Sequence, residues 1–453
     1  MDNSSAKSPG ALIISAGWSP GAYDIARSLG IAGIPSHIAS SQPSDIGFHS
    51  RHCAGRWALP CFKPENYGEI VIRLQKLGVR LGGKPVLFYA SDPELWFVWR
   101  YRRQLEPFYR FLLPPDDLLE KLFNKVLFAE FARERGLPIP RTATLRRFDE
   151  LQQLNGELTF PCIVKPAYSQ DWIWDTPEQE ARFGSYKKAL RRFDSKAQLL
   201  DFCAALPERE AGFLIQEYID GRDESIDSFH GYFDRHSRCL GYFLGRKIRT
   251  YPPHTGGSAY VRTIHNAPLA RASDEYLRRI GFQGIVKIDY KWDERAKEFI
   301  ILEINPRFNL WELLGAYAGV NLALAAYHDQ REEPVEWQSS YTDDVRLLYA
   351  KQDLRAYWTG YRHTGEWTFI SYVKSVAAKI HFRVFDPRDP LPFVVSAMGF
   401  LLRNGLRLVG VKLKVPKPGE RVFMSRRRHR EPELQQEAPP GAHPAQIKPA
   451  MTE

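Results

Sequence analysis

The chain has 453 residues, a formal net charge of +10 at pH 7, 44% hydrophobic residues and 26% charged residues. These proportions are ordinary for a folded globular protein, so they exclude fibrous and wholly disordered classes. The length predicts about two to four domains, and the positive charge indicates an anionic partner without identifying it.

The five cysteines and the N-terminal segment bear on the compartment. Five is an odd number and no Cys-x-x-Cys pair occurs, which argues against a disulfide framework and against a zinc site. The first ten residues, MDNSSAKSPG, lack the basic and then apolar layout of a secretory signal. We therefore expect a cytoplasmic protein.

Residues 1–114 predict a small parallel α/β domain. Three apolar runs, ALIISAG, IPSHIAS and PVLFYA, have the pattern of strands that alternate with helices, and this alternation is typical of a parallel sheet. Ligands bind beyond the carboxyl ends of such strands, where Asp92 follows the third run. Asp92 is therefore either a substrate contact or the N-terminal cap of the next helix.

Residues 115–330 predict a second, α+β region. One helix is expected from Asp116 to Gly136, where the glycine and the prolines beyond it form a stop signal. Four further strands are expected, with the last two antiparallel, at 160–167, 213–219, 224–233 and 239–251.

Two alternating runs, GIVKIDYKW and FIILEINPRF, predict a hairpin joined by DERAKE. A symmetric turn places Asp289 opposite Glu303. The same register places Lys287 opposite Asn305. Because two facing carboxylates repel one another, such a pair needs a cation or a proton between them.

Oxygen ligands of this kind suit Mg²⁺, with Mn²⁺ as the alternative metal. We therefore predict that Asp289, Glu303 and Asn305 hold a metal ion. The structural alternative is that the strand carboxylates pair with Lys287 and Arg307.

Magnesium with so few protein ligands requires phosphates, which in turn require cations. Lys165 ends an apolar strand and Lys125 lies on a helix, and together they suggest a phosphate site. The chain has no Gly-x-x-x-x-Gly-Lys-Ser/Thr loop, so a P-loop enzyme is not expected.

Five short segments, taken in their order along the chain, resemble the motifs of the ATP-grasp superfamily over about residues 116–326. They are FNK, FPCIVKP, IQEYIDGRDE, KIDY and LEINPR. The preceding α/β unit resembles the small domain that precedes this fold in carboxylate-amine ligases. The resemblance implies two α+β subdomains that clasp ATP. It also implies that Arg307 lies near the transferred phosphate and that Asp289, Glu303 and Asn305 bind magnesium. The residues that it implies for the nucleotide are Lys125, Lys165, Glu217, Tyr218, Ile219 and Glu224.

The stretch AYSQDWIWDTPEQEARFGSYKK departs from the family pattern, because it lacks the several glycines of a phosphate-covering loop. Gly184 and Ser185 remain, followed by two lysines. Trp172 and Trp174 either close the site or simply pack.

The stretch GRKIRTYPPHTGGSAYVRT offers three cations beside a Gly-Gly loop: Arg246, Lys247 and Arg249. Arginine binds carboxylates through two parallel hydrogen bonds, so we predict that this stretch holds the acid substrate. The stretch resembles the substrate loop of D-aspartate-ligase-like and carbamoyl-phosphate-synthetase-like relatives. A basic loop without this role is the alternative.

The resemblance implies a Mg²⁺-dependent ligase that joins a small carboxylate to an amine, or to a thiol, through an acyl phosphate, with release of ADP and phosphate. One alternative is a kinase or thioester-forming ligase on the same fold. The other is a nucleotide-binding regulatory protein without turnover. No nucleic-acid partner is expected.

Residues 331–428 form an expected C-terminal extension of unknown role, and 429–453 an expected disordered tail. Within the extension, the apolar run from Pro390 to Val415 is interrupted by arginines and lysines, and it falls short of a membrane-spanning helix. A buried or amphipathic helix is expected there. Peripheral contact with a membrane surface is the alternative.

Overall fold

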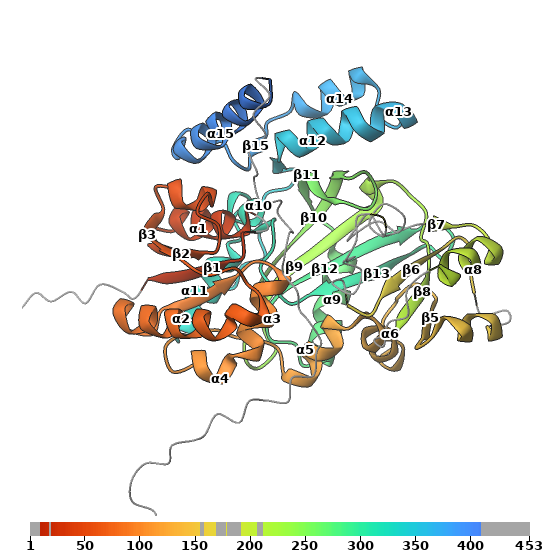
Figure 1. The fold of residues 1–453 in the computed structure, drawn as a ribbon, viewed down its shortest axis with the longest axis horizontal. Helices are drawn as coiled ribbons and strands as arrows, with labels where there is room; N and C mark the ends of the chain where they lie inside the picture. Colours follow the sequence, from red (N-terminus) through yellow and green to blue (C-terminus); the bar gives the residue numbers. More distant parts are fainter. Residues whose placement is uncertain are drawn as a thin grey trace, which may run out of the picture.

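The protein is described from a computed structural model. The described residues are 10–17, 20–154, 158–168, 178, 192–205 and 212–408. Over these residues the strands form three sheets, of four, seven and four strands (Figure 1). The predicted fold class is confirmed: a parallel α/β unit is followed by two α+β units and a C-terminal extension.

The N-terminal sheet has the strand order β3-β2-β1-β4, and its pairs are parallel. Its strand β1 is buried along its whole length because helices cover the sheet, so it has a continuous apolar sequence. The strands are β1 (Ala11–Ser15), β2 (Ser36–Ser40), β3 (Cys53–Ala58) and β4 (Val86–Tyr89). The helices are α1 (Gly21–Ile31), α2 (Tyr67–Leu81), α3 (Asp92–Arg100) and α4 (Arg102–Leu105).

The small antiparallel sheet has the order β5-β8-β6-β7. Its strands are β5 (Thr142–Leu145), β6 (Cys162–Pro166), β7 (Arg192–Phe193) and β8 (Phe213–Glu217). Its helices are α5 (Asp116–Phe123), α6 (Lys125–Glu134) and α8 (Lys196–Ala204).

The prediction of a single helix from Asp116 to Gly136 is wrong, because the helix is interrupted at Asn124. Its backbone is extended there, and its side chain accepts hydrogen bonds from the N–H groups of Val126 and Leu127, at 3.0 and 3.2 Å. This N-terminal cap begins α6 afresh. Lys125 is consequently the first residue of a helix.

The seven-stranded sheet has the order β13-β12-β9-β10-β11-β14-β15. Its central strands are β9 (Ile226–Phe233), β10 (Cys239–Tyr251), β11 (Gly257–Ile264), β12 (Gly284–Asp293) and β13 (Glu298–Asn305), with α9 (Ala267–Arg279) between β11 and β12. The antiparallel pairing of β9 with β10 is confirmed.

The predicted register of the β12–β13 hairpin is confirmed at its polar end. Asp289 pairs with Glu303 and Lys287 pairs with Asn305. Nearer the turn the register shifts by one residue, so that Tyr290 pairs with Ile301. A bulge of this kind leaves the facing carboxylates in place.

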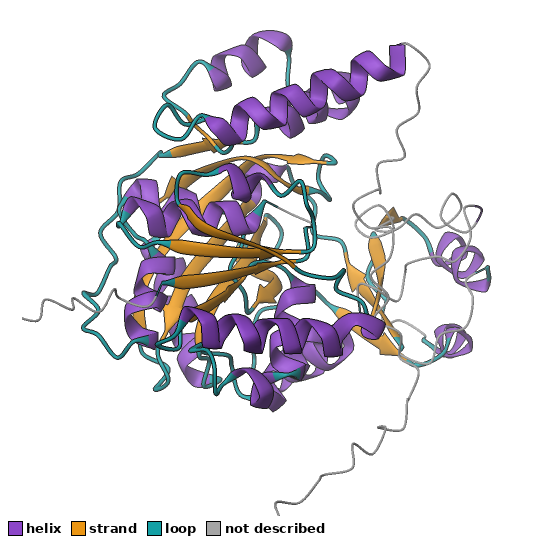
Figure 2. Ribbon diagram, turned by 60° about the vertical axis from the view of Figure 1, so that its left-hand side comes forward, coloured by secondary structure: helices purple, strands orange, loops and turns teal. Residues whose placement is uncertain are grey.

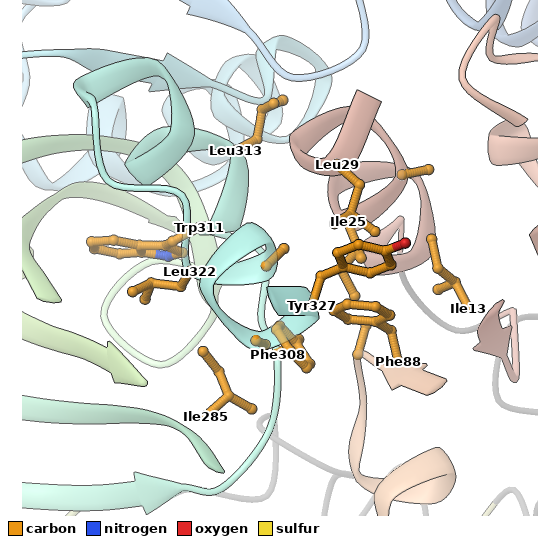
Figure 3. Packing of buried hydrophobic residues seen from close by; sticks show 14 of the residues in the cluster. Ile13, Ile25, Leu29, Phe88, Ile285, Phe308, Trp311, Leu313, Leu322 and Tyr327 are labelled. Carbon is orange, nitrogen blue, oxygen red and sulfur yellow. The ribbon is translucent and has the colours of Figure 1, made fainter. Parts of the chain in front are cut away.

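The main core joins the N-terminal sheet to helices that follow β13, α10 (Glu312–Ala318) and α11 (Leu322–Gln330). Figure 3 shows Ile25 and Leu29 of α1 facing Tyr327 of α11. Phe308 lies beside Phe88, with ring centroids 5.0 Å apart. The chain immediately after β13 is therefore anchored to the N-terminal sheet.

The C-terminal extension continues the large sheet and then covers one end of the molecule (Figures 1 and 2). Its strands are β14 (Arg346–Leu348) and β15 (His381–Phe382), and its helices are α12 (Ala350–Ala356), α13 (Arg362–Thr364), α14 (Phe369–Val376) and α15 (Leu391–Leu408). No helix among the described residues is both long and apolar enough to cross a membrane.

A buried ion pair joins this extension to β10. Arg249 donates to both carboxylate oxygens of Asp353, at 2.7 and 2.9 Å, and both side chains are fully buried. The guanidinium also lies over the rings of Tyr260, Trp367 and Tyr372. The predicted substrate contact by Arg249 is therefore wrong, since its charge is already satisfied inside the protein.

Replacing Asp353 with Asn should lower the free energy of unfolding by about 3 kcal/mol, because the buried Arg249 charge loses its partner. Asp344→Asn is the matched control. Asp344 pairs with Arg346, and the side chain of Asp344 is 46% exposed. Loss of this ion pair should therefore lower the free energy of unfolding by less than about 1 kcal/mol. Urea unfolding followed by circular dichroism measures both, and equal midpoints for the two variants would contradict the prediction.

Candidate functional site

A buried charge cluster lies on β12 at the polar end of the hairpin. Asp289 accepts hydrogen bonds from Lys287 Nζ at 2.8 Å and from Ser228 Oγ, and Lys247 Nζ lies 3.5 Å from the same carboxylate. Burial by itself would raise the pKa of Asp289, but the two lysines and the hydrogen bonds outweigh it and hold that pKa well below its ordinary value. Lysine side chains therefore already compensate the charge of Asp289.

Glu303, opposite Asp289, is exposed. Its negative charge acts on Lys165 of the small sheet and on Lys287 of the large sheet, raising the pKa of each against the effect of burial. Burial dominates at both lysines and lowers their pKa to about 8. The carboxylate thus faces the cations of two different sheets.

Two lysines predicted to bind phosphates are brought together at the small sheet. Lys165 Nζ donates to Gln216 Oε1 at 2.5 Å, and the positive charge of Lys125 further lowers the pKa of Lys165. The backbone N–H of Lys125 donates to the carbonyl of Ala167 at 2.8 Å, which fixes the start of α6 beside the end of β6. Two like charges that act on one another in this way favour an anion between them.

Arg307 links β13 to the N-terminal sheet. Its Nε donates to Asp92, and its NH2 group donates to Asn305 Oδ1 at 3.3 Å. Burial alone would lower the pKa of Arg307, but Asp92, Glu303 and Glu94 raise it, so the side chain stays charged. Asp92 is the first residue of α3 rather than its cap, which is Ser91. The capping interpretation is therefore wrong, and the substrate role of Asp92 stays a prediction.

The predicted hinge between β8 and β9 has part of its backbone already engaged. The N–H groups of Glu217 and Tyr218 donate to the carbonyls of Arg141 and Pro161, each at 2.8 Å. Of the predicted hinge donors, this leaves the N–H of Ile219 for an adenine base. Glu224, predicted to hold ribose, is exposed on the short 3₁₀ turn η6 (Asp223–Ser225).

The predicted cationic clamp on β10 is mostly paired within the protein. Arg246 forms two hydrogen bonds with the buried Asp227, at 2.7 and 3.0 Å, and its side chain is 33% exposed. Lys247 belongs to the Asp289 cluster. A Cβ atom at Gly256 would lie 1.9 Å from the backbone carbon of Tyr251, so this glycine is required by the chain's own turn.

A buried polar cluster next to Lys287 was not predicted from the sequence. Asn309 Nδ2 donates to Glu312 Oε1 at 2.9 Å and lies 3.3 Å from His230 Nδ1. Burial lowers the pKa of His230 well below its ordinary value and raises that of Glu312 to about 8, so both side chains are neutral at pH 7. His230 also stacks on Trp311. The position of His230 in the alternating run ESIDSFHGYF was the sequence feature that could have indicated this cluster.

The donor set of the predicted metal site fits Mg²⁺ through two of its three members. Glu303 and Asn305 offer oxygen atoms beside Lys165 and Arg307, where phosphates would complete the coordination. Asp289 is held by Lys287 and Ser228 and would have to exchange these partners to bind a metal. Among the described residues no group of three or more His, Cys, Asp and Glu side chains has the geometry of a metal site.

The predicted phosphate-covering loop cannot be compared with the structure. Trp172, Trp174, Gly184 and Ser185 lie outside the described residues. The expected disordered tail, 429–453, also lies outside them.

The chain is similar in sequence to two kinds of known protein. The chain is 26% identical over 277 residues to the D-aspartate ligase of Enterococcus faecium, covering 58% of this chain and 62% of that protein. It is 23% identical over 246 residues to the carbamoyl phosphate synthase large chain of Gemmatimonas aurantiaca, covering 54% of this chain and 20% of that protein. The chain thus spans less than two thirds of either relative. No family model matches.

Among solved structures, the biotin carboxylase domain of the Hydrogenobacter thermophilus 2-oxoglutarate carboxylase, crystallised with MgADP, ADP and bicarbonate, has the same fold. The TM-score is 0.54 at 13% identity, covering 75% of this chain and 74% of that one. The chain is therefore related in sequence to D-aspartate ligase and carbamoyl phosphate synthase, and it has the ATP-grasp fold. The resemblance drawn from the motifs is confirmed.

Replacing Glu303 with Gln should lower the pKa of Lys165 below its value of about 8, because a neighbouring negative charge is removed. The pH dependence of acetylation of Lys165, followed by peptide mass spectrometry, measures this pKa. Glu217→Gln is the control, since Arg295 already neutralises that carboxylate at 2.6 Å. An unchanged midpoint in the Glu303 variant would show that the two sheets do not face each other here.

Proposed function

We propose that this chain is an ATP-dependent ligase that joins a small carboxylate to an amine through an acyl phosphate and releases ADP and phosphate. The relationship to D-aspartate ligase supports the formation of a carbon–nitrogen bond. The MgADP in the structure of the biotin carboxylase domain supports a Mg²⁺–nucleotide site on this fold.

One observation carries the proposal. The exposed carboxylate of Glu303 interacts electrostatically with Lys165 of the small sheet and with Arg307, which follows β13 of the large sheet, and the positive charge of Lys125 also acts on Lys165. Phosphoryl transfer requires little covalent chemistry from a protein, but it requires cations around the transferred group. A carboxylate among cations offers a metal ligand and phosphate partners together.

In this proposal Lys125 and Lys165 hold the phosphates of ATP, and Arg307 neutralises the group being transferred. With a pKa of about 8, Lys165 is largely protonated at neutral pH, so it donates to a phosphate oxygen. Glu303 and Asn305 would hold a Mg²⁺ ion, which when bound would neutralise phosphate charge. Ile219 hydrogen-bonds adenine, and Glu224 binds ribose.

The chemistry then runs in two steps. A carboxylate oxygen of the acid attacks the γ-phosphorus, and ADP leaves. The amine next attacks the carbonyl carbon and gives up a proton, and phosphate departs with the oxygen that came from the acid. Arg246 pairs with Asp227, and about one third of its side chain is exposed. It remains the proposed contact for the acid substrate.

Lys165→Ala should weaken ATP binding by about 1 to 3 kcal/mol, the range of a charge-assisted hydrogen bond. In the unmodified protein, affinity should weaken as the pH rises through about 8, since the ammonium group loses its proton there. Lys165→Arg should give a flatter pH profile. Calorimetric titration measures these affinities, with the exposed Lys297→Ala as control. Equal affinities for Lys165→Ala and the control would contradict the assignment.

A screen of small carboxylates paired with amines should reveal a pair that releases ADP and phosphate. With the acid labelled by ¹⁸O in its carboxyl group, one label should pass into inorganic phosphate, because that oxygen leaves with the phosphoryl group. Mass spectrometry of the phosphate measures the transfer. Release of AMP and pyrophosphate, or unlabelled phosphate during amide formation, would refute the acyl phosphate.

A further inference from the structure

The C-terminal layer, residues 350–408, has an outward surface that the proposed chemistry does not use. Figures 1 and 2 show its helices together at one end of the molecule, with α12 against β10 and β11 of the large sheet and α15 over the N-terminal unit. Many of its large apolar side chains are exposed, including Ile370 at 66% and Leu401 at 67%. Of the buried or amphipathic helix expected here, the helix is present as α15 and the buried alternative is wrong, since the apolar side chains from Phe393 to Leu402 are at most partly buried.

The exposed apolar side chains of α15 cover more of the helix surface than a single narrow stripe. Phe400, Leu401 and Leu402 are consecutive and are 45%, 67% and 62% exposed. Consecutive residues of an α-helix point about 100° apart, so these three cover about 200° of its circumference. A helix that docks in a protein groove presents a narrower stripe. An apolar helix exposed on several sides fits a surrounding apolar medium.

On α14 the exposed apolar residues occupy one face. Phe369, Ile370 and Val373 follow the spacing of neighbouring positions on a helix, and they are 64%, 66% and 43% exposed. Phe369 is the aromatic member of this set, and α15 exposes two further aromatic side chains, Phe393 and Phe400. Apolar and aromatic side chains of this kind favour the boundary between lipid headgroups and acyl chains.

The charges of the layer are sorted by sign. Its four carboxylates are all directed into the body of the protein: Asp353 to Arg249, Glu366 to His254, Asp386 to Arg27, and Asp389 to Ser50 and Arg51. Its exposed cations are Lys351, Arg355, Arg362, Lys374, Lys379 and Arg388. Among the described side chains of the layer, the exposed charges are therefore all positive.

We propose that the C-terminal layer binds the surface of a bilayer that contains anionic lipid, with α14 and α15 lying in the interface. The exposed apolar side chains supply hydrophobic burial, and the exposed lysines and arginines attract the negative headgroups. The ion pairs beneath hold the layer to both the N-terminal unit and the large sheet. The protein would thus be a peripheral membrane protein, with the proposed ligase site in the same chain.

The proposal is tested with the full chain and two kinds of vesicle, one of phosphatidylcholine and one with about a quarter of phosphatidylglycerol. The protein should sediment with the anionic vesicles and weakly with the neutral ones, and added salt should reduce the binding. Two double variants, Phe369→Ser with Leu401→Ser and Lys374→Glu with Lys379→Glu, should each bind at least about tenfold more weakly.

Matched controls lie on α2, which carries exposed residues of both kinds. Ile72→Ser with Val79→Ser removes exposed apolar side chains, and Lys76→Glu with Arg80→Glu reverses exposed charges. Both should bind anionic vesicles as the unmodified chain does. The basic segment at Ser425–Arg430 is the same in every variant, so its own attraction to anionic lipid does not affect the comparison.

Three results would overturn the proposal. The first is the absence of vesicle binding, and the second is equal binding by the layer variants and the α2 controls. The third comes from sedimentation velocity without lipid: a dimer that Phe369→Ser with Leu401→Ser dissociates would make the layer an interface between two copies of the chain.

Discussion

A charged side chain buried in a sheet is stable only beside a charge of opposite sign, and this constraint sorts the polar residues of the large sheet into two groups. Asp289 is held by Lys287, and Arg249 is held by Asp353. Their charges are satisfied inside the protein. Glu303 is exposed and faces cations from another sheet, so it remains able to bind a ligand.

The position of Arg307 depends on the junction between the N-terminal sheet and the large sheet. Phe308 packs on Phe88, and Arg307 itself pairs with Asp92 at the carboxyl end of the N-terminal sheet. The same short segment therefore places the positive charge of Arg307 near the proposed phosphate site and anchors the chain in the core through Phe308. An apolar anchor next to a functional side chain limits the positions that the side chain can take.

The C-terminal extension contributes to the large sheet as well as to the surface. β14 pairs with β11, and Asp353 fixes β10 through Arg249, four residues from Gly245 at the start of the predicted substrate loop. The layer and the loop are consequently held in one arrangement. This connection gives the extension, whose sequence carries no recognised chemical motif, a structural role next to the proposed acid site.

Local features could be predicted from the sequence: many of the strands, the parallel N-terminal unit, the order of the ATP-grasp motifs and the pairing of Asp289 with Glu303. Alternation of period two fixes which residues share a face, and a short turn fixes the register. The break at Asn124 also had a local signal, since asparagine is a favoured helix cap.

The partners of the charged side chains depended on the tertiary structure. Arg249 looked available beside Arg246 in the sequence, but Asp353 reaches it from 104 residues away. Side chains that are far apart in sequence meet only after the sheets have packed, and that packing determined which charges were neutralised and which stayed open to ligands.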